Sequence, residues 1–414
     1  MFVQKLKFVS FLLLALLGWT AFVGFGLING FLLRPLTSST TPDDFIAAVD
    51  AMVDDTFVGN MALVLLDDAE ITGQYYHSIN NPVTDTTAFQ VASISKWVTA
   101  WGVFELIERG LLDLDTPVSA YLTRWQLPES EYDNEQVTIR RLLSHTAGFV
   151  DRLGYDGFRP GEPAQTLEAS LTQAADAPWS EGRAYVGVEP GTEFIYSGAS
   201  YTLLQLLIEE VSGQSFQAFM TEAVLEPLQM RHSTFVWPDS AGWALAPGYS
   251  ADGIIVPYDH FTALAAAGLY TTVADMARFV RANVKPNPVL SAESLALMYT
   301  PEAFIGTTGI HALGPEIFAR SGDSVFIHGH DGSGNVTNTA ARVNRDTGEG
   351  IIVFETGHPN LASSVADHWI FWTTGLADYV VIQANKNWLL TLLIGGYVLI
   401  LIGAVTRWRR PAKH

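Results

Sequence analysis

Two long apolar segments lie at the ends of this 414-residue chain and constrain everything between them. Residues 8–33 form an apolar run that follows Lys5 and Lys7, and residues 388–406 form a second run that a basic cluster follows. Each run is long enough to cross a bilayer as a helix, and basic residues mark the cytoplasmic side of a span. We therefore expect a protein that contacts the lipid bilayer, with both termini in the cytoplasm and the body between the spans outside it.

This pattern predicts a chain of five parts. A cleaved signal peptide is the alternative for the first segment, but the run is long for one and no small-residue cleavage site precedes Arg34. An uncleaved anchor is therefore favoured. The predicted parts are an N-terminal transmembrane anchor (1–34), a linker (35–42), a body (43–378), a second transmembrane helix (388–406) and a basic cytoplasmic tail (407–414).

The body is strongly acidic. The formal net charge of the chain is −20, and all 43 acidic residues lie between Asp43 and Asp378. Such a charge argues against nucleic acid as a partner, because nucleic-acid surfaces need clustered Lys and Arg. The chain contains no cysteine, which excludes disulfides, thiolate metal sites and a cysteine nucleophile.

The stretch Ser93-Ile94-Ser95-Lys96 stands out within the body. The apolar residues from Ile94 to Leu111 recur at helical spacing and carry few charges, which predicts a buried helix that ends at Gly110. If this helix starts at Ser93, then Ser93 and Lys96 lie on one face of its first turn. Burial lowers the pKa of a lysine towards the range of a useful base. The pair is therefore a candidate nucleophile and base.

Two further stretches offer groups that could assist this pair. Tyr196 precedes an amphipathic helix predicted near 201–211, and a tyrosine beside a lysine can pass protons. Residues 326–334 read as a strand that ends in glycine-rich backbone, which allows close approach to a ligand. A backbone N–H from this strand, together with that of Ser93, would form an oxyanion hole, and one such donor contributes about 3 kcal/mol.

Alternating apolar patterns predict strands at both ends of the body, with helices between them. This arrangement predicts an α+β fold in which the N- and C-terminal parts share one sheet and a helical subdomain is inserted. The predicted strands cover residues 61–66, 71–76, 325–330, 337–344 and 351–356, and a last helix covers 361–374.

With these motifs in order, residues 43–376 resemble the serine hydrolases of the class C β-lactamase, penicillin-binding protein and esterase group. The family's Ser-x-x-Lys motif is matched by Ser93 and Lys96. Its Tyr-x-Asn motif is matched by Tyr196 but has Gly198 in place of asparagine, and its Lys-Thr-Gly or His-x-Gly motif is matched by His330-Asp331-Gly332. Residues 138–148 resemble a supporting element of the family.

The resemblance implies a β-lactamase/transpeptidase-like fold, with an antiparallel sheet flanked by helices, and an acyl-enzyme mechanism. It implies that Lys96 deprotonates Ser93, that the Ser93 and Ser333 N–H groups hold the oxyanion, and that Tyr196 protonates the leaving group. His330 would hold or polarise the Tyr196 network. No cofactor and no metal are expected, and the partner is a small-molecule or peptide substrate.

Two departures from the family pattern concern substrate binding. Gly198 removes the side-chain amide that in relatives holds the substrate amide. Asp331 places a carboxylate where relatives have a small or hydroxyl residue, which predicts repulsion of substrates that end in a carboxylate. Both changes favour an esterase, an amidase acting on neutral or amine-bearing substrates, or an acyl transferase. The alternatives are a β-lactamase or D-Ala-type peptidase and, from another class, a non-turnover ligand sensor or a scaffold with a decayed site.

Overall fold

The computed structural model describes residues 2–53, 57–151, 155–177, 182–238, 240–321 and 324–409. The chain forms two compact units. One comprises residues 50–366, and the other comprises residues 1–49 together with 367–414.

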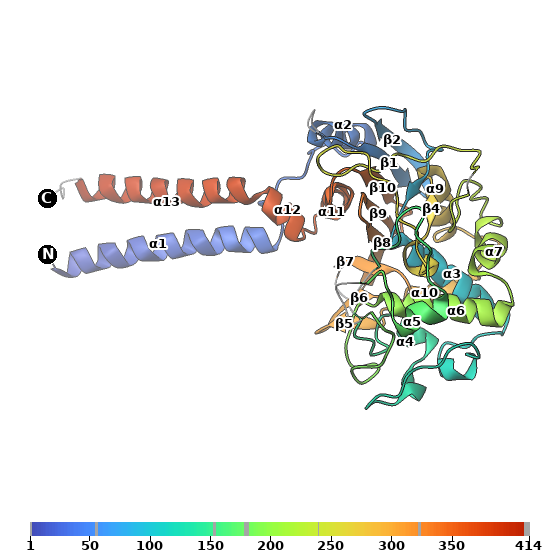
Figure 1. Cartoon of the computed structure of the whole chain (residues 1–414). Helices are drawn as coiled ribbons and strands as arrows, with labels where there is room; N and C mark the ends of the chain where they lie inside the picture. The colour runs from blue at the N-terminus through green and yellow to red at the C-terminus, as the bar shows by residue number, and fades with distance from the viewer. Residues whose placement is uncertain are drawn as a thin grey trace. The chain divides into compact units, whose positions relative to one another are not determined.

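The larger unit, residues 50–366, is built on an eight-stranded sheet in the order β2-β1-β10-β9-β8-β7-β6-β5 (Figure 1). All seven neighbouring pairs are antiparallel. The two ends of the unit meet where β1 pairs with β10, with Val64 opposite Ile352. The strands are β1 Asn60–Asp67, β2 Glu70–His77, β5 Ala303–Ile305, β6 Thr308–His311, β7 Glu316–Ser321, β8 Ser324–Ser333, β9 Thr337–Asn344 and β10 Gly350–Thr356.

Most of the regular secondary structure between β2 and β5 is helical, as the sequence predicts, and long loops separate the helices. This segment also contains a small sheet of β3 (Phe89–Gln90) and β4 (Tyr270–Thr271). Its helices are α3 Ile94–Glu108, α4 Ile139–Leu143, α5 Leu167–Thr172, α6 Gly198–Ser212, α7 Phe216–Met220, α8 Leu264–Ala267, α9 Val273–Ala282 and α10 Ala292–Met298. Short helical turns cover Val118–Ala120, Asn134–Gln136 and Thr221–Leu225. The predicted antiparallel sheet with an inserted helical subdomain is confirmed.

Helix α3 lies at the centre of this unit. It contacts β8 and β9 of the sheet, and also α6, α7 and α8 of the helical subdomain (Figure 1). Its Trp97 and Trp101 are fully buried, and both rings pack against Phe279 of α9. A helix covered on every side needs apolar residues around its whole circumference, which explains its near absence of charge.

Three short strands, β5 to β7, were not expected from the sequence. They extend the sheet beyond β8 and bring His311 opposite Glu316. These strands have three, four and six residues, and Gly306 and Gly314 lie in their connections with positive φ angles. Strands this short and interrupted by turns give no alternating pattern long enough to recognise.

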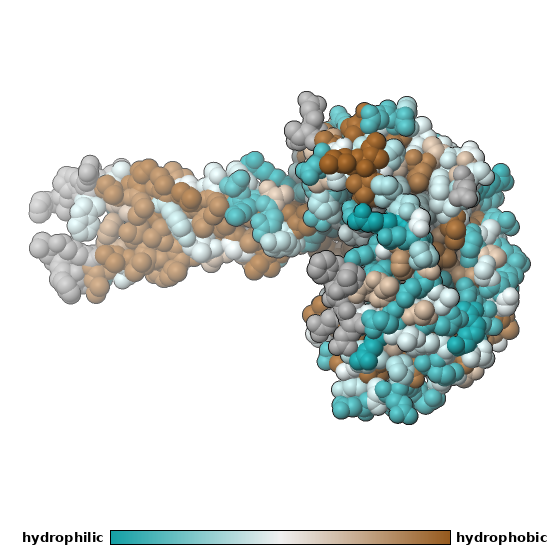
Figure 2. Space-filling model, in the orientation of Figure 1, coloured by the Kyte–Doolittle hydropathy of each residue, from teal (hydrophilic) through white to brown (hydrophobic). Residues whose placement is uncertain are grey.

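The smaller unit, residues 1–49 with 367–414, contains the two apolar helices. Helix α1 (Phe2–Ile28) and helix α13 (Lys386–Arg409) contact each other, and Figure 2 shows the apolar surface along both. The segments Leu6–Ile28 and Lys386–Trp408 are each long and apolar enough to cross a membrane. Both were predicted as spans, so the sequence and the structure agree on two candidate membrane helices. Residues 410–414 of the predicted basic tail lie outside the described residues.

Polar contacts join the two helices of this unit. The indole N–H of Trp19 in α1 donates to the Leu393 carbonyl in α13 at 3.2 Å. Arg34, in the segment after α1, places its guanidinium 3.3 Å from the centre of the Trp388 ring of α13. The short helix α12 (Tyr379–Ala384) precedes α13. Two helices cross the unit boundary, α2 (Pro42–Met52) and α11 (Leu361–Thr374), and the latter has the predicted bounds.

Candidate active site

The turn before α3 presents Ser93 at the N-terminus of a buried helix. Ala92 adopts a left-handed conformation with φ of 46°, which is costly for a residue with a Cβ and is found where surrounding structure enforces it. The Ser95 hydroxyl donates to the Ala92 carbonyl at 2.5 Å and accepts from the Leu269 amide at 2.9 Å. Among the described residues, no carbonyl accepts from the Ser93 N–H. This amide is therefore available to an oxyanion.

Lys96 lies directly beside Ser93, as the spacing predicts. Its Nζ is 3.0 Å from Ser93 Oγ and donates to the Ala266 carbonyl at 2.9 Å. The side chain is almost completely buried, and this burial lowers the pKa of Lys96 to about 7. The charges of Glu316 and Asp151 oppose the fall. A substantial share of Lys96 is thus neutral at physiological pH and able to accept the Ser93 proton.

Tyr196 completes the group around the nucleophile. Its hydroxyl hydrogen-bonds the Ser93 side chain, and the Lys96 Nζ lies 4.9 Å from the centre of its ring. Burial raises the pKa of Tyr196 above its usual value. The tyrosine is therefore a neutral phenol, which suits a proton donor to a leaving group better than a general base.

His145 holds the loop that carries Tyr196. Its Nδ1 accepts a hydrogen bond from the Ser197 amide at 3.1 Å, and its ring lies 4.4 Å from the Tyr196 ring. Burial lowers the pKa of His145 well below its usual value. The neutral imidazole therefore supports the Tyr196 loop, which agrees with a structural role for this histidine.

Gly198 is the first residue of α6 and carries no side chain towards the substrate. The helix is capped by the Ser197 hydroxyl, which accepts from the Ser200 amide at 3.0 Å, and by Asp151, which accepts from the Ala199 amide at 3.0 Å. The first turn of α6 therefore contributes no side-chain amide to the site that contains Ser93, Lys96 and Tyr196.

The end of β8 lies against the nucleophile turn. A Cβ added at Gly332 would lie 2.2 Å from the Val91 carbonyl oxygen and 2.3 Å from Thr339 Oγ1. Only glycine allows this approach, and it brings Ser333 to the same cavity as Ser93. Ser333 thus lies where its backbone N–H could serve as the expected second donor to the oxyanion.

His330 is also buried, but its contacts differ from the expected ones. Its Nδ1–H donates to the Asp331 carbonyl at 2.6 Å, and its Nε2 lies 3.7 Å from Glu316 Oε1. The centres of the His330 and Tyr196 rings are 6.5 Å apart. His330 therefore lies near the Tyr196 ring, and the described part of the chain shows no hydrogen bond between the two side chains. Burial lowers the pKa of His330, so its imidazole is neutral.

Asp331 forms an ion pair that the sequence did not reveal. Arg342 donates from Nη2 to Asp331 Oδ2 at 2.8 Å and from Nε to Oδ1 at 3.3 Å. Asp331 is not among the described residues that line the cavity around Ser93. Arg342 offsets part of the charge of Asp331, and the repulsion of a substrate carboxylate expected from this residue stays a prediction.

Glu316 is a site residue that the sequence did not reveal. Burial raises the pKa of its carboxyl group, and Asp331 contributes further. Its charge in turn raises the pKa values of Lys96 and Tyr196. Glu316 lies on the unpredicted strand β7, so no pattern in the sequence marks it.

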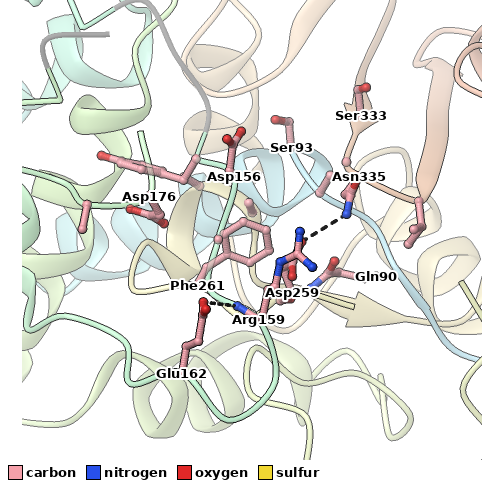
Figure 3. A pocket seen from close by; sticks show the side chains of 18 of the residues that line it. Gln90, Ser93, Asp156, Arg159, Glu162, Asp176, Asp259, Phe261, Ser333 and Asn335 are labelled. Atoms are coloured by element: carbon pink, nitrogen blue, oxygen red, sulfur yellow. Dashed lines mark hydrogen bonds between the residues drawn. The ribbon is translucent and has the colours of Figure 1, made fainter. Parts of the chain in front are cut away.

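A cavity of about 650 Å³ opens around Ser93, and Lys96 and Ser333 also line it (Figure 3). Its size suits a small molecule or a short peptide segment. Among the described residues, no group of three or more His, Cys, Asp or Glu side chains is arranged to hold a metal ion.

Comparison with known proteins places this geometry in a family context. A family model described as Beta-lactamase matches residues 45–370. Protein flp of Staphylococcus aureus (strain MW2) is 28% identical over 224 residues, which cover 52% of this chain and 42% of that protein. The putative penicillin-binding protein PbpX of Bacillus subtilis (strain 168) is 24% identical over 288 residues, which cover 68% of this chain and 64% of that protein. The matches thus span less than two thirds of these relatives.

Solved structures resemble the same region. The octameric penicillin-binding protein homologue from Pyrococcus abyssi gives a TM-score of 0.65 at 24% identity, covering 81% of this chain and 77% of that chain. This likeness confirms the predicted β-lactamase/transpeptidase-like fold.

Proposed function

Because the chain belongs to the Beta-lactamase family, we propose that it is a serine hydrolase that acts on an ester or amide through an acyl-enzyme at Ser93. The observation that carries this proposal is the 3.0 Å contact between Ser93 Oγ and Lys96 Nζ, together with the lowered pKa of Lys96. A nucleophile within hydrogen-bond reach of a base of suitable pKa is the basic requirement for covalent catalysis.

In the proposed acylation, Lys96 takes the proton of Ser93 while Ser93 Oγ bonds to the substrate carbonyl carbon. The N–H groups of Ser93 and Ser333 stabilise the oxyanion that forms. As the bond to the leaving group breaks, Tyr196 donates its proton to that group and recovers one from the Lys96 ammonium. Water then attacks the acyl carbonyl carbon and gives a proton to the Lys96–Tyr196 pair. As the bond from the acyl carbon to Ser93 Oγ breaks, the pair returns a proton to Oγ, which releases the acid and restores the Ser93 hydroxyl.

The two apolar helices support anchoring of this hydrolase in a membrane. The basic residues Lys5 and Lys7 before the first helix and Arg407 after the second favour cytoplasmic termini. We therefore place the hydrolase unit outside the cytoplasm. A protease added to intact cells that express the full chain with a C-terminal tag should cut the body and leave the tag intact. Protection of the body would contradict this orientation.

Labelling of the full chain in detergent tests the enzyme proposal. A fluorophosphonate probe should label the wild type at Ser93 and should not label Ser93→Ala, with both proteins folded by circular dichroism. A fluorescent penicillin supplies the second arm. Rapid penicillin acylation followed by release would support the β-lactamase alternative, and stable penicillin labelling would support the sensor. If neither probe labels Ser93, both the serine hydrolase proposal and the β-lactamase alternative are contradicted.

A further inference from the structure

A second hollow adjoins the cavity around Ser93. It has a volume of about 280 Å³, and Gln90 and Phe261 line both spaces. Figure 3 shows these two side chains among those that line the cavity around Ser93. We call the second hollow the aromatic recess. Its side-chain lining further includes Phe235, Val236, Trp237, His260, Leu264 and Tyr270.

The two adjoining spaces differ in their charge. The described lining of the cavity around Ser93 carries the cations Lys96 and Arg159 and the acidic residues Asp156, Glu162, Asp176 and Asp259. Among the described residues that line the aromatic recess there is no Asp, Glu, Lys or Arg. Hollows lined mainly by aromatic and aliphatic side chains bind the apolar parts of ligands. The recess therefore suits an apolar group that is attached to a carbonyl held at Ser93.

Polar atoms in the wall of the recess have partners within the protein. The side-chain amide nitrogen of Gln90 donates to the Tyr270 hydroxyl at 2.9 Å and to the Asp259 carbonyl at 2.8 Å. The Trp237 ring packs against the Tyr270 ring, with 5.3 Å between the ring centres. A sugar or a peptide backbone that loses its water here needs matched hydrogen-bond partners, whereas a hydrocarbon group needs none. The wall thus favours a hydrocarbon ligand.

A third hollow continues from the aromatic recess. It has a volume of about 500 Å³ and shares the lining residues Trp237, His260 and Tyr270 with the recess. Three spaces thus adjoin in series, beginning at Ser93. Such a series suits an extended, flexible chain better than a single compact ring. The third hollow adds further apolar side chains, among them Leu245, Ile255 and Tyr258.

We propose that this site acts on esters or amides that carry an unbranched hydrocarbon chain, and that the aromatic recess binds this chain while Ser93 attacks the carbonyl. The substrate class is thus a fatty-acyl or alkyl ester or amide. This inference rests on the proposed serine hydrolase function and names its substrate. Each methylene group that leaves water for the recess should strengthen binding by a factor of about four.

Two series of esters test the chain on the full-length protein in detergent. One series has the p-nitrophenyl esters of acetic, butyric, hexanoic and octanoic acid, and the other has the acetate esters of ethanol, butanol, hexanol and octanol. In one series kcat/KM should rise about threefold to fourfold per added methylene. That series assigns the chain to the acyl or the alcohol part of the substrate. A flat or falling kcat/KM in both series would overturn the substrate class.

Val236 offers a substitution that tests the recess itself. It lines the recess but is 51% exposed, so a polar side chain there leaves the core intact. Val236→Asp places a carboxylate that the chain would have to desolvate. The ratio of kcat/KM for the longest over the shortest ester of the responsive series should fall at least about tenfold. Using this ratio removes effects on the chemistry at Ser93 and on partition into detergent.

Ile305→Asp is the matched control for Val236→Asp. Ile305 is 68% exposed on β5 and does not belong to the described lining of the three spaces. This variant gains the same charge and should keep the ratio within about twofold of the wild-type value. An equal fall in both variants would overturn the recess as the binding site, because it would indicate only a general effect of charge.

Fluorophosphonates separate this inference from the hydrolase proposal. If no ester is turned over, the rates at which ethyl and octyl fluorophosphonates label Ser93 are compared. The octyl compound should react faster with the wild type and with Ile305→Asp, and should lose this advantage with Val236→Asp. Labelling without this dependence overturns the recess and leaves the hydrolase intact, whereas absence of labelling overturns the hydrolase.

Light scattering distinguishes another occupant of the recess, a second copy of this chain. If Val236→Asp changes the mass of the particle in detergent and leaves the chain-length ratio unchanged, the recess holds a neighbouring copy and the inference is overturned. We expect the mass to stay the same and the ratio to fall.

Discussion

Lys96 and Arg342 are two cations that the larger unit buries almost completely, each with 1% of its surface exposed. Arg342 forms a two-point ion pair with Asp331 and also lies 3.9 Å from the centre of the Phe318 ring. Lys96 contacts the Ser93 hydroxyl and the Ala266 carbonyl, and among the described residues no carboxylate lies within ion-pair distance of its Nζ. Equal burial thus comes with different partners.

The two residues are equally buried, so the partner of each cation, rather than its burial, accounts for the difference between them. An ion pair offsets the cost of burying a charge, and a guanidinium remains protonated in proteins. A buried ammonium without a direct carboxylate partner gives up its proton more easily, and the pKa of Lys96 accordingly falls to about 7. Burial alone therefore marks neither residue as catalytic. In the proposed mechanism, Lys96 can act as a base because no described carboxylate pairs directly with its ammonium.

The largest expected effect is on turnover when Lys96 is replaced. Lys96→Met should lower kcat about 10³- to 10⁴-fold, because a positioned base contributes a factor of this order. Its thermal midpoint should not fall, since the variant removes an uncompensated buried charge. Ester hydrolysis and thermal unfolding of the full chain in detergent measure both quantities.

Lys96→Arg is the matched control for charge. The guanidinium cannot give up its proton, so this variant should be as inactive as Lys96→Met. Activity above about a tenth of the wild-type value in Lys96→Arg would show that a cation, rather than a neutral amine, is needed at this position.

Replacement of the other cation should affect stability instead. Arg342→Met leaves Asp331 charged without its ion-pair partner, which should lower the free energy of unfolding by about 3–5 kcal/mol. Activity per folded molecule should stay within a few-fold, because neither residue is among the described lining of the cavity. Urea unfolding followed by tryptophan fluorescence measures the change.

The double variant Arg342→Met with Asp331→Asn sharpens this result. Removing both charges should recover part of the lost stability, because the unpaired carboxylate is gone. If the double variant is destabilised by the sum of the two single changes, the pair contributes no coupling and Asp331 is not stabilised by Arg342.

The pH dependence of turnover separates the two cations further. Lys96 acts as a base only when neutral, and its folded-state pKa of about 7 lies below the usual lysine value. The kcat/KM should therefore rise with pH, level off above about 7, and fall about tenfold per unit below it. Asp331→Asn should leave this acid limb in place. An acid limb that moves with the Asp331 substitution would mean that the two cations are coupled.

The sequence revealed one of these cations and not the other, for a physical reason. Ser93 and Lys96 lie three residues apart in one helix, so their contact follows from helical periodicity alone. The Asp331–Arg342 pair spans two strands, and its contact depends on the register that places Gly329 opposite Arg342 and Asp331 opposite Ala340. Both strands were predicted, but their register was not.

Other residues of the site escaped prediction because they depend on tertiary structure. Glu316 reaches the site through strand β7, which pairs with β6, and both short strands lack a recognisable pattern. The long strands, the central helix and the three family motifs were predictable because each is recorded in local spacing. Pairings between distant segments were not.

The smallest expected effect comes from a conservative change of the structural cation. Arg342→Lys keeps the positive charge beside Asp331 but replaces a planar group that makes two parallel hydrogen bonds with a single ammonium. We expect a loss of about 1–2 kcal/mol in the free energy of unfolding, of the order of one lost charge-assisted hydrogen bond. Turnover and its acid limb should not change. The reciprocal exchange, Lys96→Arg, should abolish turnover. Exchanging arginine and lysine should therefore lower stability at position 342 and lower activity at position 96. A turnover defect in Arg342→Lys would break the comparison, because it would show that the structural cation also tunes the reaction.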